Sequence, residues 1–119
     1  ELFYRLLPTE QTLANAIADY QAAIDLSPYD PFLRYNLAMA YITLKRYPEA
    51  QEQLEKALDL EPNFIRGYYL LGKVLSALGE KEASAEKLEA ARALAGQFNP
   101  GSYDSVYLKN LFQWPDMRE

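Results

Sequence analysis

The chain has 119 residues, half of them hydrophobic, which is the size of one domain with enough apolar side chains for a continuous core. Its formal net charge is −5, and an acidic chain is a poor candidate for nucleic-acid binding, because that affinity comes mainly from cations that meet phosphates. It has no cysteine, no histidine and no apolar run of about 18 residues, so we expect no disulfide, no metal or cofactor site, no nucleophilic triad and no membrane span.

The first elements have a helical pattern. The chain opens inside an apolar pattern and without an initiator methionine, so we interpret it as a piece of a longer protein in which residues 1–7 end a helix. A helix over 8–26 follows. Asp30 and Pro31 start the next one, because an aspartate side chain caps a helix and a proline is tolerated where its missing N–H would be unpaired anyway. Residues 45–47 make the turn that ends it.

The middle of the chain continues with two more helices. Pro48 opens a helix that residues 61–63 bring to an end. Asn63 can cap the following helix, over 64–78, because an asparagine side chain accepts hydrogen bonds from the first turn. Gly79 can then supply the left-handed residue that closes this helix.

The last part of the chain adds a further helix, over 80–95, and a loop over 97–102. A short amphipathic helix over 102–112 comes next and stops at 114–115, where a proline follows a tryptophan. We therefore expect about seven helices and no strand, which is an all-α fold.

The helices repeat with a fixed period. The segment 23–28 (AIDLSP) coincides with 57–62 (ALDLEP) when the chain is slid by 34 residues, and 91–96 (ARALAG) is a weaker third copy. A period of this length indicates a repeat array, in which each supersecondary unit stacks on the next. Such a solenoid offers an extended surface and no catalytic pocket defined by the fold, so we do not expect an enzyme.

This repeat resembles the tetratricopeptide repeat, a family of 34-residue units built from two antiparallel helices. The unit over 31–64 matches its pattern at Leu37, Ala38, Tyr41, Ala50, Leu54, Ala57 and Pro62. The unit over 65–97 matches it at Tyr68, Leu71, Gly72, Leu88 and Ala91. It departs at Leu75, Ser84 and Gly96, where the family has Tyr, Ala and Pro.

The resemblance implies a right-handed α-solenoid of antiparallel helix pairs. We expect a partial repeat over 1–28, full repeats over 31–64 and 65–97, and a C-terminal capping helix and tail over 98–119. A cap has a physical reason, because a repeat buries its apolar face only against its neighbours. A helix that binds a partner or a membrane surface is the alternative for this last segment.

Two patterns in the sequence mimic chemistry that we do not expect. The segment 67–74 reads G-x-x-x-x-G-K-V, one residue from a phosphate-binding loop, but Val74 stands where a Ser or Thr would hold Mg²⁺, and the pattern is helical. Gly72 already has a role as the close-packing residue of the repeat. The many carboxylates of 49–59 and 80–89 fall on the polar sides of their helices, where we interpret them as a solvated outer face.

The resemblance implies that the first helix of each repeat lines a concave groove. Beside its core stripe, the helix from Pro31 has a second apolar stripe, and a helix that is apolar on two sides must be buried on both or must bind a partner. The partner-binding candidates are Arg5, Phe32, Tyr35, Asn36, Met39, Arg66, Tyr69 and Lys73. Alternatively, the apolar members of this set pack against helices that precede this piece, or against another copy of the chain.

The function we expect is that of a non-catalytic interaction module, a scaffold or adaptor within a larger protein. Its groove would bind a peptide or helix with apolar and acidic residues. One alternative is a structural element that self-associates or joins the subunits of an assembly. Another is a regulatory domain attached to an enzyme or a membrane protein. The sequence leaves the compartment open between cytoplasm and periplasm.

Some members of the family hold the C-terminal carboxylate of chaperones with five polar residues. Asn36 matches one of those positions and Arg66 is a conservative replacement at another. The other three positions hold Glu1, Arg5 and Leu70, which do not fit. We therefore do not expect this chain to bind chaperone tails.

Overall fold

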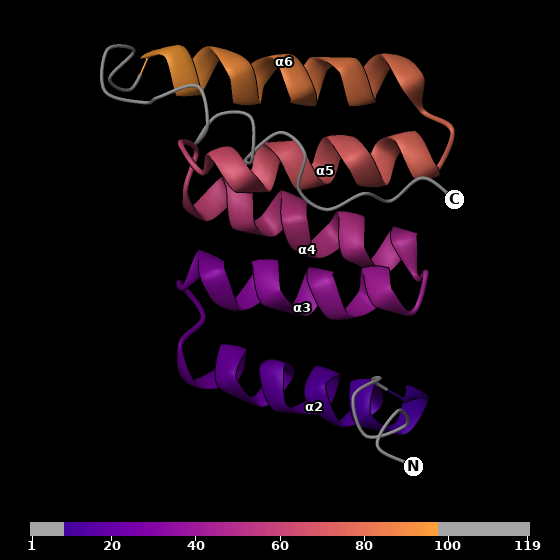
Figure 1. The fold of residues 1–119 in the computed structure, drawn as a ribbon. Helices are drawn as coiled ribbons and strands as arrows, with labels where there is room; N and C mark the ends of the chain where they lie inside the picture. Colours follow the sequence, from indigo (N-terminus) through magenta and orange to yellow (C-terminus); the bar gives the residue numbers. More distant parts are fainter. Residues whose placement is uncertain (1–8, 98–119) are drawn as a thin grey trace, which may run out of the picture.

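The computed structural model describes residues 9–97, which form five helices and no strand. The helices are α2 (Glu10–Leu26), α3 (Pro31–Thr43), α4 (Tyr47–Leu60), α5 (Ile65–Ala77) and α6 (Lys81–Gln97). They stack in chain order, each antiparallel to the next, and α3 and α5 pack most extensively on the helix that follows them (Figure 1). The all-α helical-repeat fold is confirmed. The helices expected over 1–7 and 102–112 lie outside the described residues.

The starts of α2 and α3 follow from their capping residues. The hydroxyl of Thr9 accepts a hydrogen bond from the backbone N–H of Thr12 at 3.0 Å. The carboxylate of Asp30 accepts one from the backbone N–H of Phe32 at 2.9 Å, and Pro31 takes the first position of the helix. Each bond satisfies a donor that the first turn would otherwise leave unpaired.

The start of α5 differs from the expectation that Asn63 caps it. The residue at the cap position is Phe64, whose side chain makes no capping hydrogen bond. The backbone N–H of Asn63 donates instead to the carboxylate of Glu61 at 3.1 Å, within the preceding turn. Phe64 is fixed by packing, because its ring centroid lies 5.1 Å from that of Phe32 and 5.2 Å from that of Tyr35. The helix α5 therefore begins without a side-chain cap, at a residue that aromatic contacts hold in place.

The core extends from α2 to α5, and Ala83 of α6 packs against it. Its fully buried large side chains are Leu37, Leu54, Leu70, Leu71 and Val74. The small residues of the repeat let the helices approach closely. A Cβ atom added at Gly72 would come within 2.7 Å of Cδ2 of Leu88, and the hydroxyl of Ser84 donates a hydrogen bond to the carbonyl oxygen of Gly72 at 2.7 Å. The close contact of α5 with α6 therefore depends on the absence of a side chain at Gly72.

Within 9–97, no helix is both long and apolar enough to cross a membrane.

Candidate functional site

Seven of the eight predicted partner-binding residues lie on α3 and α5, and we call these seven the groove stripe. They are Phe32, Tyr35, Asn36, Met39, Arg66, Tyr69 and Lys73. The eighth, Arg5, lies outside the described residues. In the 34-residue register Tyr35 corresponds to Tyr69 and Met39 to Lys73. The groove stripe therefore takes its residues from the first helices of two successive antiparallel helix pairs.

The accessible part of the groove stripe is cationic on α5, and on α3 it is apolar except for Asn36. The ring of Phe32 is 61% exposed, and Asn36 and Arg66 are exposed as well. Met39 and Lys73 are half-buried. A ligand along these two helices would therefore meet an aromatic ring, a thioether and two cations.

The two tyrosines of the groove stripe are buried, with Tyr35 6% and Tyr69 4% exposed. Tyr35 belongs to the main core and packs on Phe64. Because this contact lies within the chain, Tyr35 is a core residue that supports the exposed members of the groove stripe. Tyr69 has the Nζ atom of Lys73 6.0 Å from its ring centroid, at the outer limit of a cation–π contact.

Sequence reasoning missed Phe64 as a residue of this region. It is buried and contacts both Phe32 and Tyr35, so it joins α3 to the start of α5. A signal was available. In the repeat register Phe64 corresponds to Asp30, a capping position, where an aromatic residue is unusual and indicates a packing role.

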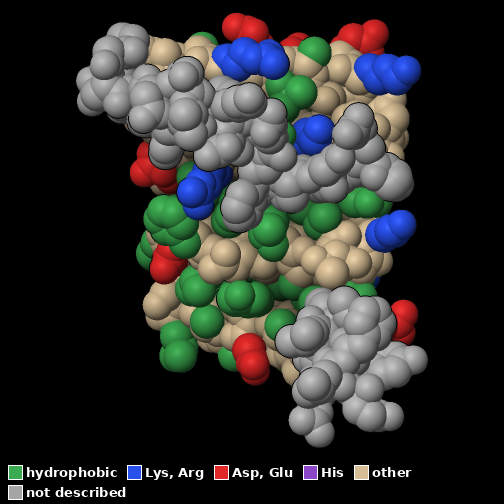
Figure 2. Space-filling view, viewed as in Figure 1, with side chains coloured by type: hydrophobic (Ala, Val, Ile, Leu, Met, Phe, Trp, Pro, Cys, Tyr) green, Lys and Arg blue, Asp and Glu red, His purple; other side chains and the backbone are tan. Residues whose placement is uncertain are grey.

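Three large apolar side chains stay exposed where α2 gives way to α3. Leu26 is 86% exposed and Tyr29 83%, and Phe32 follows them. Figure 2 shows hydrophobic side chains over α2 and α3, several of them at the left-hand edge where these helices join. Exposed apolar residues in a cluster often mark an interaction surface.

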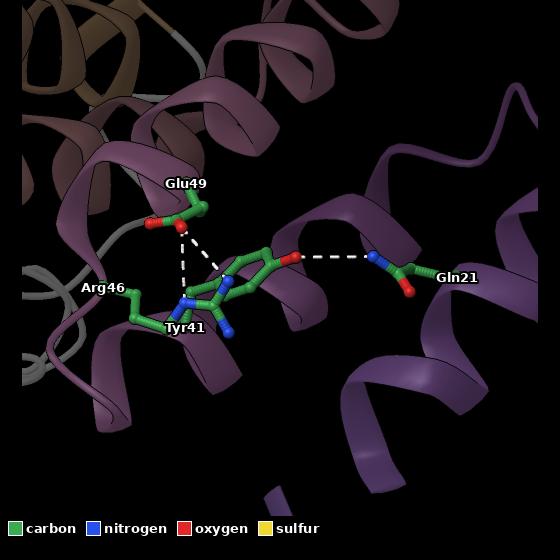
Figure 3. Close-up of polar contacts among 4 residues, drawn as sticks. All are labelled: Gln21, Tyr41, Arg46 and Glu49. Carbon is green, nitrogen blue, oxygen red and sulfur yellow. Dashed lines mark hydrogen bonds and ion pairs between the residues drawn. The ribbon is translucent and has the colours of Figure 1, made fainter. Parts of the chain in front are cut away.

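A polar network around Tyr41 fixes α3 between its neighbours (Figure 3). The Tyr41 hydroxyl accepts a hydrogen bond from Nε2 of Gln21 on α2 at 3.4 Å. The guanidinium of Arg46 lies over the Tyr41 ring, 4.8 Å from its centroid, and pairs with Glu49 of α4 at 3.1 Å. The hydrogen bond from Arg46 lowers the pKa of Glu49 below its ordinary value. These contacts tie α3, which carries part of the groove stripe, to α2 and α4.

Comparison with known proteins identifies relatives of this chain. Residues 9–74 match the family model described as tetratricopeptide repeat. Hsp70-Hsp90 organizing protein 2 of Arabidopsis thaliana is 34% identical over 77 residues, which cover 65% of this chain and 14% of that protein. The E3 ubiquitin-protein ligase CHIP of the same plant is 32% identical over 94 residues, which cover 79% of this chain and 34% of the ligase.

A solved structure shows the same fold. The TPR2B domain of yeast Sti1, in its complex with pHsp70, superimposes with a TM-score of 0.73 at 30% identity. The match covers 87% of this chain and 82% of that one. By contrast, this chain spans only 14% of the first of the two curated relatives named above and 34% of the second.

Proposed function

The chain belongs to the tetratricopeptide repeat family, and we propose that it is a non-catalytic interaction module that binds a peptide or helix along the groove stripe. One observation carries this proposal. The first helices of two successive repeats, α3 and α5, present an exposed aromatic ring at Phe32 and two cations at Arg66 and Lys73, on a chain whose net charge is −5.

The chemistry of this stripe selects a class of ligand. Phe32 and the half-buried Met39 offer contact to apolar side chains, and the two cations offer it to carboxylates. The ligand is therefore a segment with apolar anchors and acidic residues. The yeast Sti1 domain, whose structure is a complex with pHsp70, supports a protein ligand as the class.

The groove stripe differs from a chaperone-tail site at Leu70. That position would need a cation, but Leu70 is a leucine with 0% of its surface exposed, so it belongs to the core. The cations of α5 are Arg66 and Lys73, which lie two helical turns, or about 10 Å, apart along the helix. A ligand with two separated negative charges fits this spacing better than a single terminal carboxylate group does.

Charge reversal tests the proposal with a matched control. Peptides selected from a random-sequence phage library on the 119-residue chain serve as the probe, because their composition is itself a result. We expect acidic and apolar residues to be enriched. The double variant R66E/K73E should weaken binding at least about tenfold, since two ion pairs of about 1 kcal/mol each become repulsive.

The control K45E/K81E changes the charge equally, at exposed positions away from the groove stripe, and should bind as the parent does. Equal loss in the two double variants would contradict the proposal, as would peptides without acidic residues. Tyr35 and Tyr69 are unsuitable for this test, because replacing buried rings destabilises the fold.

Self-association is a second candidate function, and the exposed cluster of Leu26, Tyr29 and Phe32 favours it. A sedimentation-velocity series over a wide concentration range tests it. Self-association is supported if the sedimentation coefficient rises with concentration and if the substitution Y29S abolishes that rise. A strict monomer at all concentrations contradicts self-association and leaves the peptide proposal standing.

A regulatory domain attached to an enzyme remains an alternative, which the likeness to part of an E3 ubiquitin-protein ligase supports.

A further inference from the structure

A hollow of about 370 Å³ opens between α4, α5 and α6, and we call it the outer pocket. Its contribution from α5 is Tyr68 and Leu71. At about 100° per residue, these two residues point about 160° away from the direction of Arg66, Tyr69 and Lys73 on the same helix. The outer pocket is therefore on the other side of the stack from the groove stripe, and it is a separate candidate site.

The base of the outer pocket is apolar. Leu71 is fully buried, Leu58 is nearly so, and the ring of Tyr68 is half-buried at one wall. An apolar base with an aromatic wall and a few polar groups at the rim is the usual construction of a small binding site. What binds there is decided by the charges of the rim.

The rim on α4 is negative, and the cation that lines the pocket with it, Lys87, comes from α6. Glu55 and Asp59 are four residues apart and so lie on one face of the helix. Glu55 accepts a hydrogen bond from Gln51 at 3.0 Å, whereas the carboxylate of Asp59 has no hydrogen-bond or ion-pair partner among residues 9–97. Asp59 also lies in the last turn of α4, which has no basic residue, and the carbonyl end of a helix adds partial negative charge. Both effects favour a cation supplied from outside.

The opposite wall already presents an aromatic face to a cation. The Nζ atom of Lys87 lies 6.0 Å from the centroid of the Tyr68 ring, at the outer limit of an effective cation–π contact. A guanidinium is planar and more weakly hydrated than an ammonium, so it stacks on a ring better and pairs with a carboxylate through two parallel hydrogen bonds. An arginine side chain could therefore displace Lys87 from the ring.

A metal ion is excluded by the ligand set. The described residues contain no group of three or more Asp, Glu, His or Cys side chains that could hold one, and the two rim carboxylates come from a single helix. The aromatic wall and apolar base would also leave a small hydrated ion without ligands on that side.

We propose that the outer pocket binds an arginine side chain of a partner protein. The guanidinium stacks on Tyr68 and donates hydrogen bonds to the carboxylate of Asp59, and Glu55 adds negative charge at the rim. The carbon stem of the arginine packs on Leu58, above the fully buried Leu71. The site is independent of the groove stripe, so one molecule could hold two partner segments on opposite sides.

The test uses amide ¹H–¹⁵N spectra of the 119-residue chain titrated with N-acetyl-arginine amide. We expect saturable shifts of the amide signals of Asp59, Tyr68 and Lys87. N-acetyl-citrulline amide, which has the same shape without the charge, should leave these signals in place. Equal shifts with both probes, or no saturable shift with the arginine probe, would overturn the proposal.

Two variants of the same pocket are expected to change the affinity in opposite directions. Asp59→Asn should weaken binding of the arginine probe about fivefold, because it removes one charge-assisted pair. Lys87→Gln should strengthen binding, because it frees the Tyr68 ring and removes a repulsive charge. Asp19→Asn on α2 is the matched control, an exposed aspartate far from the outer pocket. The site would be refuted if Asp59→Asn and Asp19→Asn changed the affinity for the arginine probe equally. It would also be refuted if Lys87→Gln lowered that affinity.

Discussion

Lys45 and Gly79 occupy the same position of successive repeats, 34 residues apart, and both have a left-handed backbone, with φ of 61° and 86°. The hydrogen bonds around them also correspond. The residue after each donates its backbone N–H to the carbonyl oxygen of Tyr41 or Leu75, at 2.8 and 2.9 Å. Both turns are therefore the same helix-closing motif, which is easiest for glycine to form. In the earlier repeat a lysine forms it.

Replacing Lys45 with glycine is expected to stabilise the chain. A non-glycine residue in the left-handed region costs about 1–2 kcal/mol, of which the greater freedom of glycine in the unfolded chain offsets part. The free energy of unfolding, measured by urea denaturation, should rise by about 0.5–1 kcal/mol. The reverse change, G79A, should lower it by a similar amount, because its Cβ would meet no atom within 4 Å and only the backbone cost remains. A K45G variant less stable than the parent would contradict this reading of the turn.

Replacing Gly72 with alanine should destabilise the α5–α6 pair. The added Cβ would meet Leu88 at 2.7 Å and the carbonyl oxygen of Ser84 at 3.3 Å. Overpacking of this kind costs about 1–3 kcal/mol, which thermal or urea unfolding can measure. G96A is the control, because a Cβ at Gly96 would lie in open space. If G72A and G96A have equal stabilities, close packing at Gly72 is not what joins the two helices.

Replacing Phe64 with alanine should be among the most damaging changes to the chain. Its buried ring contacts both Phe32 and Tyr35, so its loss leaves a cavity and should cost about 3–4 kcal/mol. Phe32→Ala removes the same number of atoms from a largely exposed site and should cost less than about 1 kcal/mol. Comparable losses in the two variants would show that Phe64 does not organise the start of α5.

Replacing Arg46 with glutamine should raise the pKa of Glu49. The hydrogen bond from Arg46 lowers this pKa in the folded chain, so the ionised form of Glu49 stabilises the fold above its unfolded pKa. That contribution is lost as the pH falls through the lowered folded pKa. A ¹³C titration of the glutamate carboxyl signals should show the midpoint of Glu49 move upward in R46Q and stay in place in K56Q. An unchanged midpoint in R46Q would remove Arg46 as the cause.

Much of this fold could be predicted from the sequence, because the repeat period fixes which small residues face their neighbours. Ala38, Ala57 and Ala91 have no exposed surface, and Gly72 is packed against Leu88, as the 34-residue register requires. Asp30 caps α3 and Gly79 closes α5 as expected. These are local or periodic features, so they can be recognised without knowing the distances between helices.

The features that were not predicted depend on contacts between repeats. Phe64 replaces Asn63 at the start of α5, because its ring packs on residues of α3 that are far away in the sequence. The burial of Tyr35 follows from its own contact with the ring of Phe64. The outer pocket combines Tyr68, a position of the repeat pattern, with the carboxylates of Glu55 and Asp59, which the sequence assigns to a solvated face. Its volume depends on how far α4 and α6 stand apart, which no local pattern specifies.

The central claim, that α3 and α5 form the ligand-binding side, is tested most directly by mapping a bound peptide. Amide ¹H–¹⁵N spectra of the 119-residue chain would be recorded with increasing amounts of one library-selected acidic peptide. We predict that the largest saturable shifts fall on Phe32, Asn36, Arg66 and Lys73, and that R66E/K73E abolishes them. Shifts confined to the outward residues of α4 and α6, with the groove stripe unchanged, would contradict the account.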